Sequence, residues 1–565
     1  MALVSEKTQQ THWHGLESRL AQGLLLVALV IAALIPRVST DVVIGIDEAA
    51  LWRNRAETFV AKLGDGAFGE TFLAPHPGVV TLWLGATGVT LNKVLHGPYY
   101  YQADSVDYFR LLRLPIAIFN ALGVGLAYYL LRRLLNTPLA LLAALFWVFD
   151  PFVVAQSQIL HTDAPVMLLA FLTTLTALIA LGMDDPERPI GDQIIVRRRW
   201  WLLSSVLFGL TVVAKLNGVV TVAALGLIIL LRYRDQWRNR RWWRRLFQAL
   251  FVFGALGAVA FVAAFPGMWV EPVTTFVGMF NRANELVQDG HTQLLFDRVS
   301  EDPGPLFYVV TTLFRLTPLL SIGLLLSPLA FFSQKLRPYR PVLAALLVYA
   351  VVFFVITALQ SKKIDRYMLP IFPALYVFAA AGFVGLGAAL SRRLQPRLDA
   401  SKLAVAGVFA FIALAVVALV QLVGSSPYMM TYYNPLLGGL PAAASVTTVG
   451  WGEGLEQAAA FINEDSQGNC HFILSDYTYV TDVFTGCETL ETRNCEYAEF
   501  AADPSDSYVV LYLSYTQRDM NMTLQTAVEG AEPIFISRIS GVPMAWVYAA
   551  DDVNLEVIRQ AGEQC

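Results

Sequence analysis

The sequence predicts an all-α polytopic membrane domain of about eleven transmembrane helices, residues 1–425, followed by a small extracytoplasmic α/β domain, residues 426–565. The chain has 565 residues, of which 56% are hydrophobic and only 15% are charged, and its mean hydropathy is +0.54. Soluble domains carry about 25% charged residues, so we expect the apolar excess to face lipid. The net charge of −4 gives no indication of a nucleic-acid partner.

Eleven apolar segments approach the length that a helix needs to cross a bilayer, about 20 residues. They lie at residues 20–36, 108–131, 138–154, 164–182, 200–214, 217–231, 247–265, 306–330, 341–359, 368–390 and 402–424. The fifth and sixth segments are short, and only residues 215–218 separate them.

Basic residues are distributed unequally between the two sets of loops. If the N-terminus is cytoplasmic, the six cytoplasmic segments hold 22 of the 40 Lys and Arg residues within 78 positions. This bias follows the positive-inside rule, so the arginine-rich run 232–246 is interpreted as a topology determinant and not as a nucleic-acid patch. We therefore expect an integral protein of the plasma (inner) membrane, with its C-terminal domain outside the cytoplasm.

The opposite face carries the longer connections. The first outer loop, residues 37–107, is too long for a simple turn and includes an amphipathic stretch, residues 79–95, that could lie in the membrane interface. Two further outer loops are expected at residues 266–305 and 360–367.

The sequence pattern of residues 426–565 predicts an α/β domain. A helix is predicted at residues 453–462, and strands are predicted at residues 471–474, 508–513, 534–537 and 544–549. The segment holds 19 acidic and four basic residues and all four cysteines of the chain. An even number of cysteines suits an oxidising compartment, where three pairings are possible; four free thiols are the alternative.

Three groups of residues that could carry chemistry fall on the outer face. The first is the acidic pair Asp47–Glu48, which follows the first span within an apolar stretch. Partial desolvation there would raise the pKa of a carboxylate and make it a better base. The simpler alternative is a pair of solvated acids in a loop.

The second group is His161–Thr162–Asp163, between the third and fourth spans. An acid at the mouth of a span is unfavourable unless it is paired or hydrated, so Asp163 is a functional candidate. Thr162 or Asp163 could also cap the helix that begins at Ala164–Pro165, and both interpretations can hold together. A His and an Asp two residues apart could contribute to a metal site but do not define one.

The third group is Lys362, Lys363, Asp365, Arg366 and Tyr367, with Lys215 from the turn between the fifth and sixth spans. Cations on the outer side run against the positive-inside trend. A phosphate at the bilayer surface would explain them, since Lys and Arg bind phosphate oxygens by charge-assisted hydrogen bonds. Anchoring to lipid headgroups is the alternative.

These groups together indicate one chemistry, because they combine an acid that takes a proton, cations that hold a phosphate and an adjacent bilayer. A group linked to a lipid phosphate would be transferred to a hydroxyl or amine outside the cytoplasm, with the acid deprotonating the acceptor and the cations stabilising the departing phosphate. A transporter or flippase for a lipid-linked anion is a competing hypothesis, although no repeated halves are evident in the sequence. A non-catalytic subunit of a membrane complex is the third.

Several short motifs, taken in order, resemble a known family across roughly residues 40–550. They are Asp47–Glu48, His76–Trp83, Thr162–Pro165, Lys363–Pro370, Pro427–Tyr428, Tyr432–Pro435, Gly438–Gly439, Gly450–Gly454 and Gln517–Arg518. Together they resemble the polyprenyl-phosphate-sugar-dependent glycosyltransferases of the GT-C fold, in the branch of the protein O-mannosyltransferases and aminoarabinose-transferase-like enzymes, and in particular a bacterial subgroup.

This resemblance implies a polyprenyl-phosphate sugar as donor, inversion at the sugar, and a protein, lipid or glycan as acceptor. It implies that Asp47 is the catalytic base, that Glu48 assists or orients the acceptor, and that Asp163 is a second essential acid. The remaining implied residues line the site or meet the donor phosphate: His76, His161, Lys215, Lys363 and Arg366. No cofactor is firmly predicted, although a divalent metal is possible.

Overall fold

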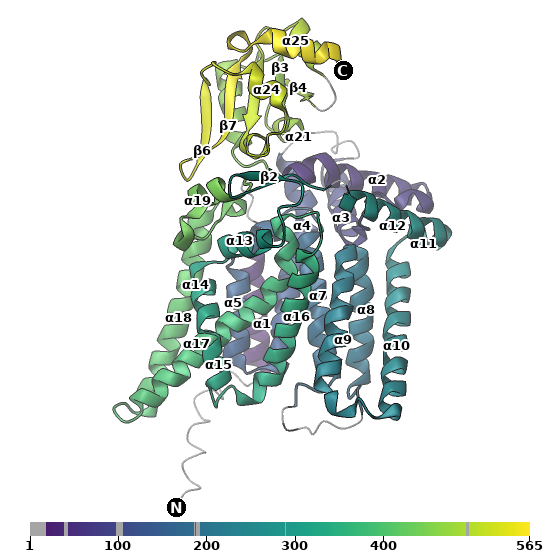
Figure 1. Cartoon of the computed structure of the whole chain (residues 1–565), viewed down its shortest axis with the longest axis vertical. Helices are drawn as coiled ribbons and strands as arrows, with labels where there is room; N and C mark the ends of the chain where they lie inside the picture. Colours follow the sequence, from purple (N-terminus) through teal and green to yellow (C-terminus); the bar gives the residue numbers. More distant parts are fainter. Residues whose placement is uncertain are drawn as a thin grey trace, which may run out of the picture.

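The computed structural model describes residues 19–38, 43–97, 106–185, 187, 193–288, 290–492 and 496–564. Figure 1 shows a bundle of long helices with a smaller, sheet-containing domain above one of its ends. The last helix of the bundle ends at Ser425. The predicted combination of an all-α membrane domain and a small α/β domain is confirmed.

The bundle is built from helices at the positions of the predicted spans. They are α1 (Arg19–Arg37), α4 (Val106–Leu134), α5 (Thr137–Val148), α6 (Pro151–Gln158), α7 (Asp163–Ala180), α8 (Arg198–Ala214), α9 (Val220–Arg232), α10 (Arg240–Ala264), α13 (Leu306–Arg315), α14 (Pro318–Leu326), α15 (Pro328–Phe332), α16 (Arg340–Ala358), α17 (Phe372–Leu394) and α18 (Ala400–Ser425). Among the described residues, seven helices are long and apolar enough to cross a membrane, or nine if each of two bent pairs is one span. With the shorter α8 and α9, these nine correspond to the eleven predicted segments.

The two bends have a local cause in the sequence. Between α5 and α6 the chain turns by 62°, because Asp150 begins a new helix: its Oδ1 accepts from Val153 N at 3.0 Å, and Pro151 occupies the first position. Between α13 and α14 the turn is 114°, and Thr317 caps α14 ahead of Pro318 in the same way. Both bends lie where a proline interrupts an apolar run.

The connection between α9 and α10, which carries the arginine-rich run, lies at the end of the bundle away from the sheet domain, and so does the connection between α17 and α18 (Figure 1). The basic loops and the sheet domain therefore occupy opposite ends of the helices, as the positive-inside pattern requires.

The long outer loops are largely helical. The first contains a π-helix η2 (Glu48–Trp52), α2 (Arg53–Gly64), a 3₁₀ turn η3 (Phe68–Thr71) and α3 (Val79–His96), which matches the predicted amphipathic stretch. The second contains α11 (Gly267–Val270), α12 (Pro272–Gln288) and a hairpin of β1 (Gln293–Leu295) and β2 (Arg298–Ser300). A third short element, η8 (Asp365–Ile371), leads into α17.

The C-terminal domain has a five-stranded mixed sheet in the order β4-β3-β5-β7-β6. Its elements are α19 (Gly439–Val446), α20 (Leu455–Asp465), β3 (Phe472–Ser475), α21 (Thr478–Thr481), β4 (Glu488–Glu491), α22 (Tyr497–Ala502), β5 (Tyr508–Tyr512), α23 (Leu513–Thr516), α24 (Met522–Ala527), β6 (Phe535–Ile539), β7 (Val542–Ala549) and α25 (Leu555–Gln564). The predicted helix and all four predicted strands are present. β4 was not predicted, because this edge strand has only four residues and an acidic side chain at each end.

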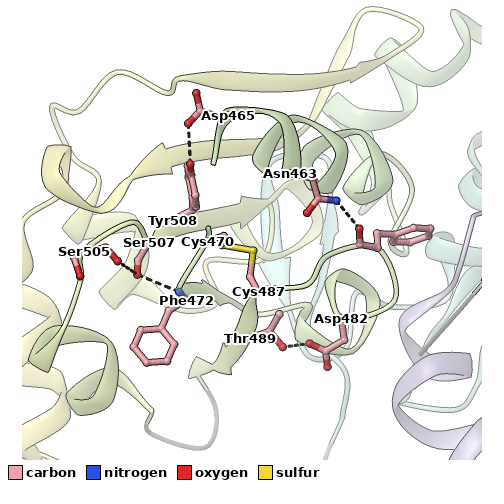
Figure 2. Close-up of a disulfide and its surroundings, with 11 residues drawn as sticks. Asn463, Asp465, Cys470, Phe472, Asp482, Cys487, Thr489, Ser505, Ser507 and Tyr508 are labelled. Carbon is pink, nitrogen blue, oxygen red and sulfur yellow. Dashed lines mark hydrogen bonds between the residues drawn. A yellow bond between two sulfur atoms is a disulfide. The ribbon is translucent and has the colours of Figure 1, made fainter. Parts of the chain in front are cut away.

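A disulfide joins Cys470, just before β3, to Cys487, just before β4 (Figure 2). It ties together two neighbouring parallel strands. The other two cysteines, Cys495 and Cys565, lie outside the described residues.

The sheet domain and the first outer loop share one hydrophobic core. Ile44 and Trp52 from the loop belong to the same buried cluster as Val480 and Tyr512 from the domain. A backbone hydrogen bond from Ile46 N to the carbonyl of Trp451, 3.1 Å long, also crosses this boundary. The domain is therefore packed onto the segment that contains Asp47.

Helices of the bundle approach each other closely at glycines, as is common in membranes. A Cβ atom added to Gly382 in α17 would lie 2.1 Å from the carbonyl oxygen of Gly323 in α14. Gly387, one and a half turns further along α17, has open space around it.

We therefore expect Gly382→Ala to force α14 and α17 apart and to reduce stability by about 1–3 kcal/mol, the usual cost of overpacking. Thermal unfolding of the purified protein in detergent would measure this loss. Gly387→Ala is the matched control in the same helix and should unfold near the wild-type temperature. Equal unfolding temperatures for the two variants would contradict the close helix contact.

Candidate functional site

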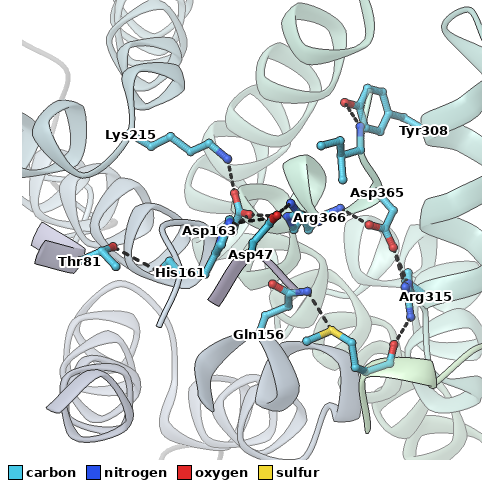
Figure 3. A network of polar contacts seen from close by, with 12 residues as sticks. Asp47, Thr81, Gln156, His161, Asp163, Lys215, Tyr308, Arg315, Asp365 and Arg366 are labelled. Carbon is cyan, nitrogen blue, oxygen red and sulfur yellow. Dashed lines mark hydrogen bonds and ion pairs between the residues drawn. The ribbon is translucent and has the colours of Figure 1, made fainter. Parts of the chain in front are cut away.

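Two carboxylates from distant parts of the chain meet at one guanidinium. Nη2 of Arg366 donates to Oδ2 of Asp47 at 2.7 Å, and Nε of the same side chain donates to Oδ2 of Asp163 at 3.0 Å (Figure 3). Asp47 precedes η2, Asp163 begins α7, and Arg366 lies at the start of η8. The structure thus brings the three groups of sequence-predicted residues together.

Lys215 supplies a second cation to Asp163. Lys215 directly follows the last residue of α8 and has an extended backbone conformation. Its Nζ donates to Oδ1 of Asp163, the second oxygen of that carboxylate (Figure 3). The ammonium also lies 4.0 Å from the centre of the Tyr367 ring, within the range of a cation–π contact. Each oxygen of Asp163 therefore faces a positive group, which is what a buried carboxylate needs to remain charged.

His161 stands between the two carboxylates. Its Nδ1 lies 3.0 Å from Oδ2 of Asp163, and its Nε2 lies 3.5 Å from Oδ2 of Asp47. The side chain is almost fully buried, and the indoles of Trp52 and Trp451 meet its ring edge to face at 5.7 and 5.5 Å. The imidazole is thus held in one place between both acids.

His76 lies on another side of Trp52, with the centre of its ring 6.2 Å from that of the Trp52 ring. Burial and the positive charge of Lys215 hold the pKa of His76 well below its ordinary value. His76 is therefore neutral at pH 7 and can accept as well as donate a hydrogen bond.

The prediction that desolvation would raise the pKa of Asp47 is wrong for this arrangement. Burial does favour the protonated acid, but the hydrogen bond with His161 and the charge of Arg366 outweigh it, so the pKa of Asp47 is lowered. A carboxylate that is so strongly paired is a weak base until a cation is drawn away from it.

Glu48 does not join this cluster through any contact in the described part of the chain. Its fully buried carboxylate forms a bidentate ion pair with Arg113 of α4, with Nε 2.9 Å from Oε1, and also accepts from Leu160 N at 2.8 Å. It therefore ties the Asp47 segment to α4 and to the residues just before His161. This geometry favours a positioning role over the predicted role in orienting the acceptor.

Lys363 also contacts residues outside the cluster of Asp47, Asp163 and Arg366. Its Nζ donates to Oδ1 of Asp302 at 2.7 Å and to the carbonyl of Gln360, and its side chain is 2% exposed. The hydrogen bond from Lys363 holds the pKa of Asp302 below its ordinary value. The charge of the adjacent Lys362 contributes to lowering the pKa of His291.

One residue that the sequence did not single out, Arg315, supports Arg366. Arg315 in α13 donates from Nε to Oδ2 of Asp365 at 2.8 Å, and Asp365 in turn accepts from the backbone N of Arg366 at 2.7 Å (Figure 3). Arg315 is held by the carbonyls of Met430 and Tyr432, both at 2.8 Å. An arginine inside an apolar span is itself a functional signal, and it could have revealed this contact.

His291, just before β1, was also not predicted. Burial and the positive charges of Arg518, Arg366 and Lys362 lower the pKa of His291 from its ordinary value of 6.5 to about 3. It is therefore a neutral group on which the charges of several cations act.

The carboxylates do not fit a metal site. Both are already neutralised by protein cations, and within the described ranges no group of three or more His, Cys, Asp or Glu side chains is arranged to hold a metal ion. The arrangement instead offers acids that can take a proton and cations that can bind an anion.

Comparisons with known proteins agree with this chemistry. Residues 107–265, which include Asp163 and Lys215, match the family model for dolichyl-phosphate-mannose-protein mannosyltransferase. A comparison with curated proteins found no match.

Three similar solved structures are distant in sequence. ArnT from Cupriavidus metallidurans bound to undecaprenyl phosphate is 15% identical, with 94% of this chain and 98% of that chain covered and a TM-score of 0.48. The archaeal oligosaccharyltransferase AglB from Archaeoglobus fulgidus is 13% identical, with 93% and 74% covered and a TM-score of 0.44. The S. cerevisiae Pmt1–Pmt2 complex bound to the sugar donor is 19% identical, with 43% and 33% covered and a TM-score of 0.34.

The family match over residues 107–265 agrees with the predicted resemblance to this group of membrane glycosyltransferases.

The lowered pKa of His291 predicts a pH dependence of folding. The unfolded chain binds a proton at His291 below about pH 6.5, whereas the folded chain does so only near pH 3. Stability is therefore lost as the pH falls from 6.5 toward 3, by at most about 1.4 kcal/mol per pH unit for one such group.

We expect His291→Gln to show a smaller fall in unfolding temperature between pH 7 and pH 4.5 than the wild type. Unfolding temperatures at pH 8, where His291 is neutral in both states, provide the baseline. Parallel curves for the two proteins would show that His291 does not titrate in this way.

Proposed function

We propose that the protein transfers a sugar from a polyprenyl-phosphate carrier to an extracytoplasmic acceptor, with inversion at the sugar. The observation that carries this proposal is the bridge that Arg366 forms between Asp47 and Asp163, with Lys215 on the other side of Asp163. One pocket thereby combines a candidate base with two cations that can hold a phosphate.

The donor phosphate binds at Lys215 and Arg366 in this proposal. Both cations lie against aromatic rings, Tyr367 for Lys215 and Trp451 for Arg366, at 4.0 and 4.2 Å from the ring centres. They are thus held in place before any ligand arrives, and preorganised cations stabilise a departing phosphate better than mobile ones. Asp163 keeps the pair together, since it accepts from both.

Binding of the phosphate would also activate the base. Arg366 donates to Asp47 in the structure, and a phosphate that draws the guanidinium toward itself removes part of the charge that lowers the pKa of this carboxylate. Asp47 then becomes a stronger base only when the donor is present.

The transfer step follows from these positions. Asp47 takes the proton from the acceptor hydroxyl or amine, and the acceptor atom forms a bond to the anomeric carbon on the face opposite the phosphate. The bond between that carbon and the phosphate oxygen breaks, and polyprenyl phosphate leaves with the electron pair. Lys215 and Arg366 stabilise its charge.

The orientation of the site is part of the proposal. The cluster lies at the end of the bundle that carries the sheet domain, and the arginine-rich α9–α10 connection lies at the other end (Figure 1). The positive-inside rule then places the cluster, the sheet domain and the acceptor outside the cytoplasm.

Asp47→Asn should reduce transfer by about 10²–10⁴-fold, the usual contribution of a general base. The measurement is release of polyprenyl phosphate from a polyprenyl-phosphate sugar by protein reconstituted in nanodiscs with a crude acceptor extract. Asp65→Asn, an exposed acid after α2 in the same outer loop, is the control and should match the wild type. Wild-type turnover by Asp47→Asn would exclude the role assigned to this residue.

The orientation can be tested by cysteine labelling in intact cells. In a chain whose Cys495 and Cys565 are replaced by serine, Glu529→Cys should react with a membrane-impermeant maleimide, and Asp235→Cys should react only after the cells are opened. The reverse pattern would contradict the proposed topology.

A further inference from the structure

We infer that the C-terminal domain completes the phosphate site through Trp451, which acts as a positioning residue for Arg366; this inference rests on the proposed function. The Arg366 guanidinium lies 4.2 Å from the centre of the Trp451 ring. The tryptophan belongs to the turn before α20, whereas Arg366 lies in the first turn of η8 in the membrane domain. A residue of the sheet domain thus contacts the cation that bridges both carboxylates.

The indole packs against the Asp47 segment as well. A Cβ built on Gly45 would lie 3.5 Å from the ring carbon Cε3 of Trp451, so the backbone two residues before Asp47 packs against the indole. The ring also meets His161 edge to face at 5.5 Å. Trp451 therefore touches the segment of the base, the bridging cation and the histidine that lies between both acids.

The turn that carries Trp451 is fixed on both sides. Gly452 has φ of +121°, and a side chain there would place Cβ 2.6 Å from the carbonyl oxygen of Ile44. Its N–H donates to the Tyr512 hydroxyl in β5 at 2.9 Å, and the Trp451 carbonyl accepts from Ile46 N at 3.1 Å. The sheet domain and the Asp47 segment thus hold the indole between them.

Loss of the indole should weaken phosphate binding more than it disturbs the fold. Arg366 would keep its two carboxylate partners but lose the surface that fixes the plane of its guanidinium. Cation–π contacts of this kind change affinity by roughly 5- to 30-fold. Because the contact acts on the phosphate-binding group, we expect the change in the Michaelis constant for the donor to exceed the change in kcat.

The test compares Trp451→Ala, Trp451→Phe and the control Trp546→Ala in nanodiscs. Trp546 packs in a separate core of the sheet domain and reports on loss of domain stability alone. One readout is kcat and KM for a polyprenyl-phosphate sugar. The other, which needs no turnover, is the rise in unfolding temperature caused by undecaprenyl phosphate.

We expect Trp451→Ala to raise the donor KM by roughly 5- to 30-fold and to lose most of the stabilisation by undecaprenyl phosphate. Trp451→Phe should restore much of both, and Trp546→Ala should keep the wild-type KM despite a lower unfolding temperature. A wild-type protein that is stabilised by undecaprenyl phosphate but inactive would contradict the proposed transfer reaction, while loss of that stabilisation in Trp451→Ala would still support the positioning role.

Two outcomes would overturn the inference. The first is a Trp451→Ala variant with wild-type KM and wild-type stabilisation by undecaprenyl phosphate. The second is a loss of function in Trp451→Ala that Trp451→Phe does not rescue and that Trp546→Ala reproduces, because this result would indicate a purely structural contribution to the domain.

Discussion

The bridge from Arg366 to Asp47 and Asp163 is the interaction on which the rest of the site depends. It joins a loop after the first helix, the start of α7 and the start of η8, which lie hundreds of residues apart. Charged groups at the edge of a bilayer are stable only when they are paired or hydrated, so each group requires the others. The same pairing makes the site responsive to an anion, because a phosphate competes with the carboxylates for the same cations. The same contacts thus stabilise the charged groups of the site and control how strong a base Asp47 is.

A second layer of contacts holds this bridge in place. Glu48 and Arg113 fix the segment of Asp47 against α4, and Arg315 fixes Asp365 next to Arg366. Arg315 is itself bound by the chain just after α18, at Met430 and Tyr432, so the start of the C-terminal segment already contributes to the site. The sheet domain then covers the cluster, and its core is continuous with that of the first outer loop. The domain is therefore part of the site and not a separate module.

Much of this could be predicted from the sequence. The length of apolar runs locates the helices of the bundle, and apolar, β-branched runs locate four of the five strands of the C-terminal sheet. Asp163, Lys215 and Arg366 were expected in one site because they fall on the same predicted membrane face and fit the roles that the family resemblance implies. Sequence spacing could not tell which way neighbouring side chains point: Glu48 beside Asp47, and Lys363 near Arg366, face different partners. The role of Trp451 could not be predicted from the sequence either, because it depends on how the two domains pack against each other.

The most direct test of this account is an experimental structure of the protein in nanodiscs with polyprenyl phosphate. The account predicts that the phosphate contacts Lys215 and Arg366, that Arg366 has moved away from Asp47, and that Asp47 faces the open space next to the phosphate. A phosphate bound at Lys363 and Asp302, or an Asp47 that lies remote from the phosphate, would contradict it.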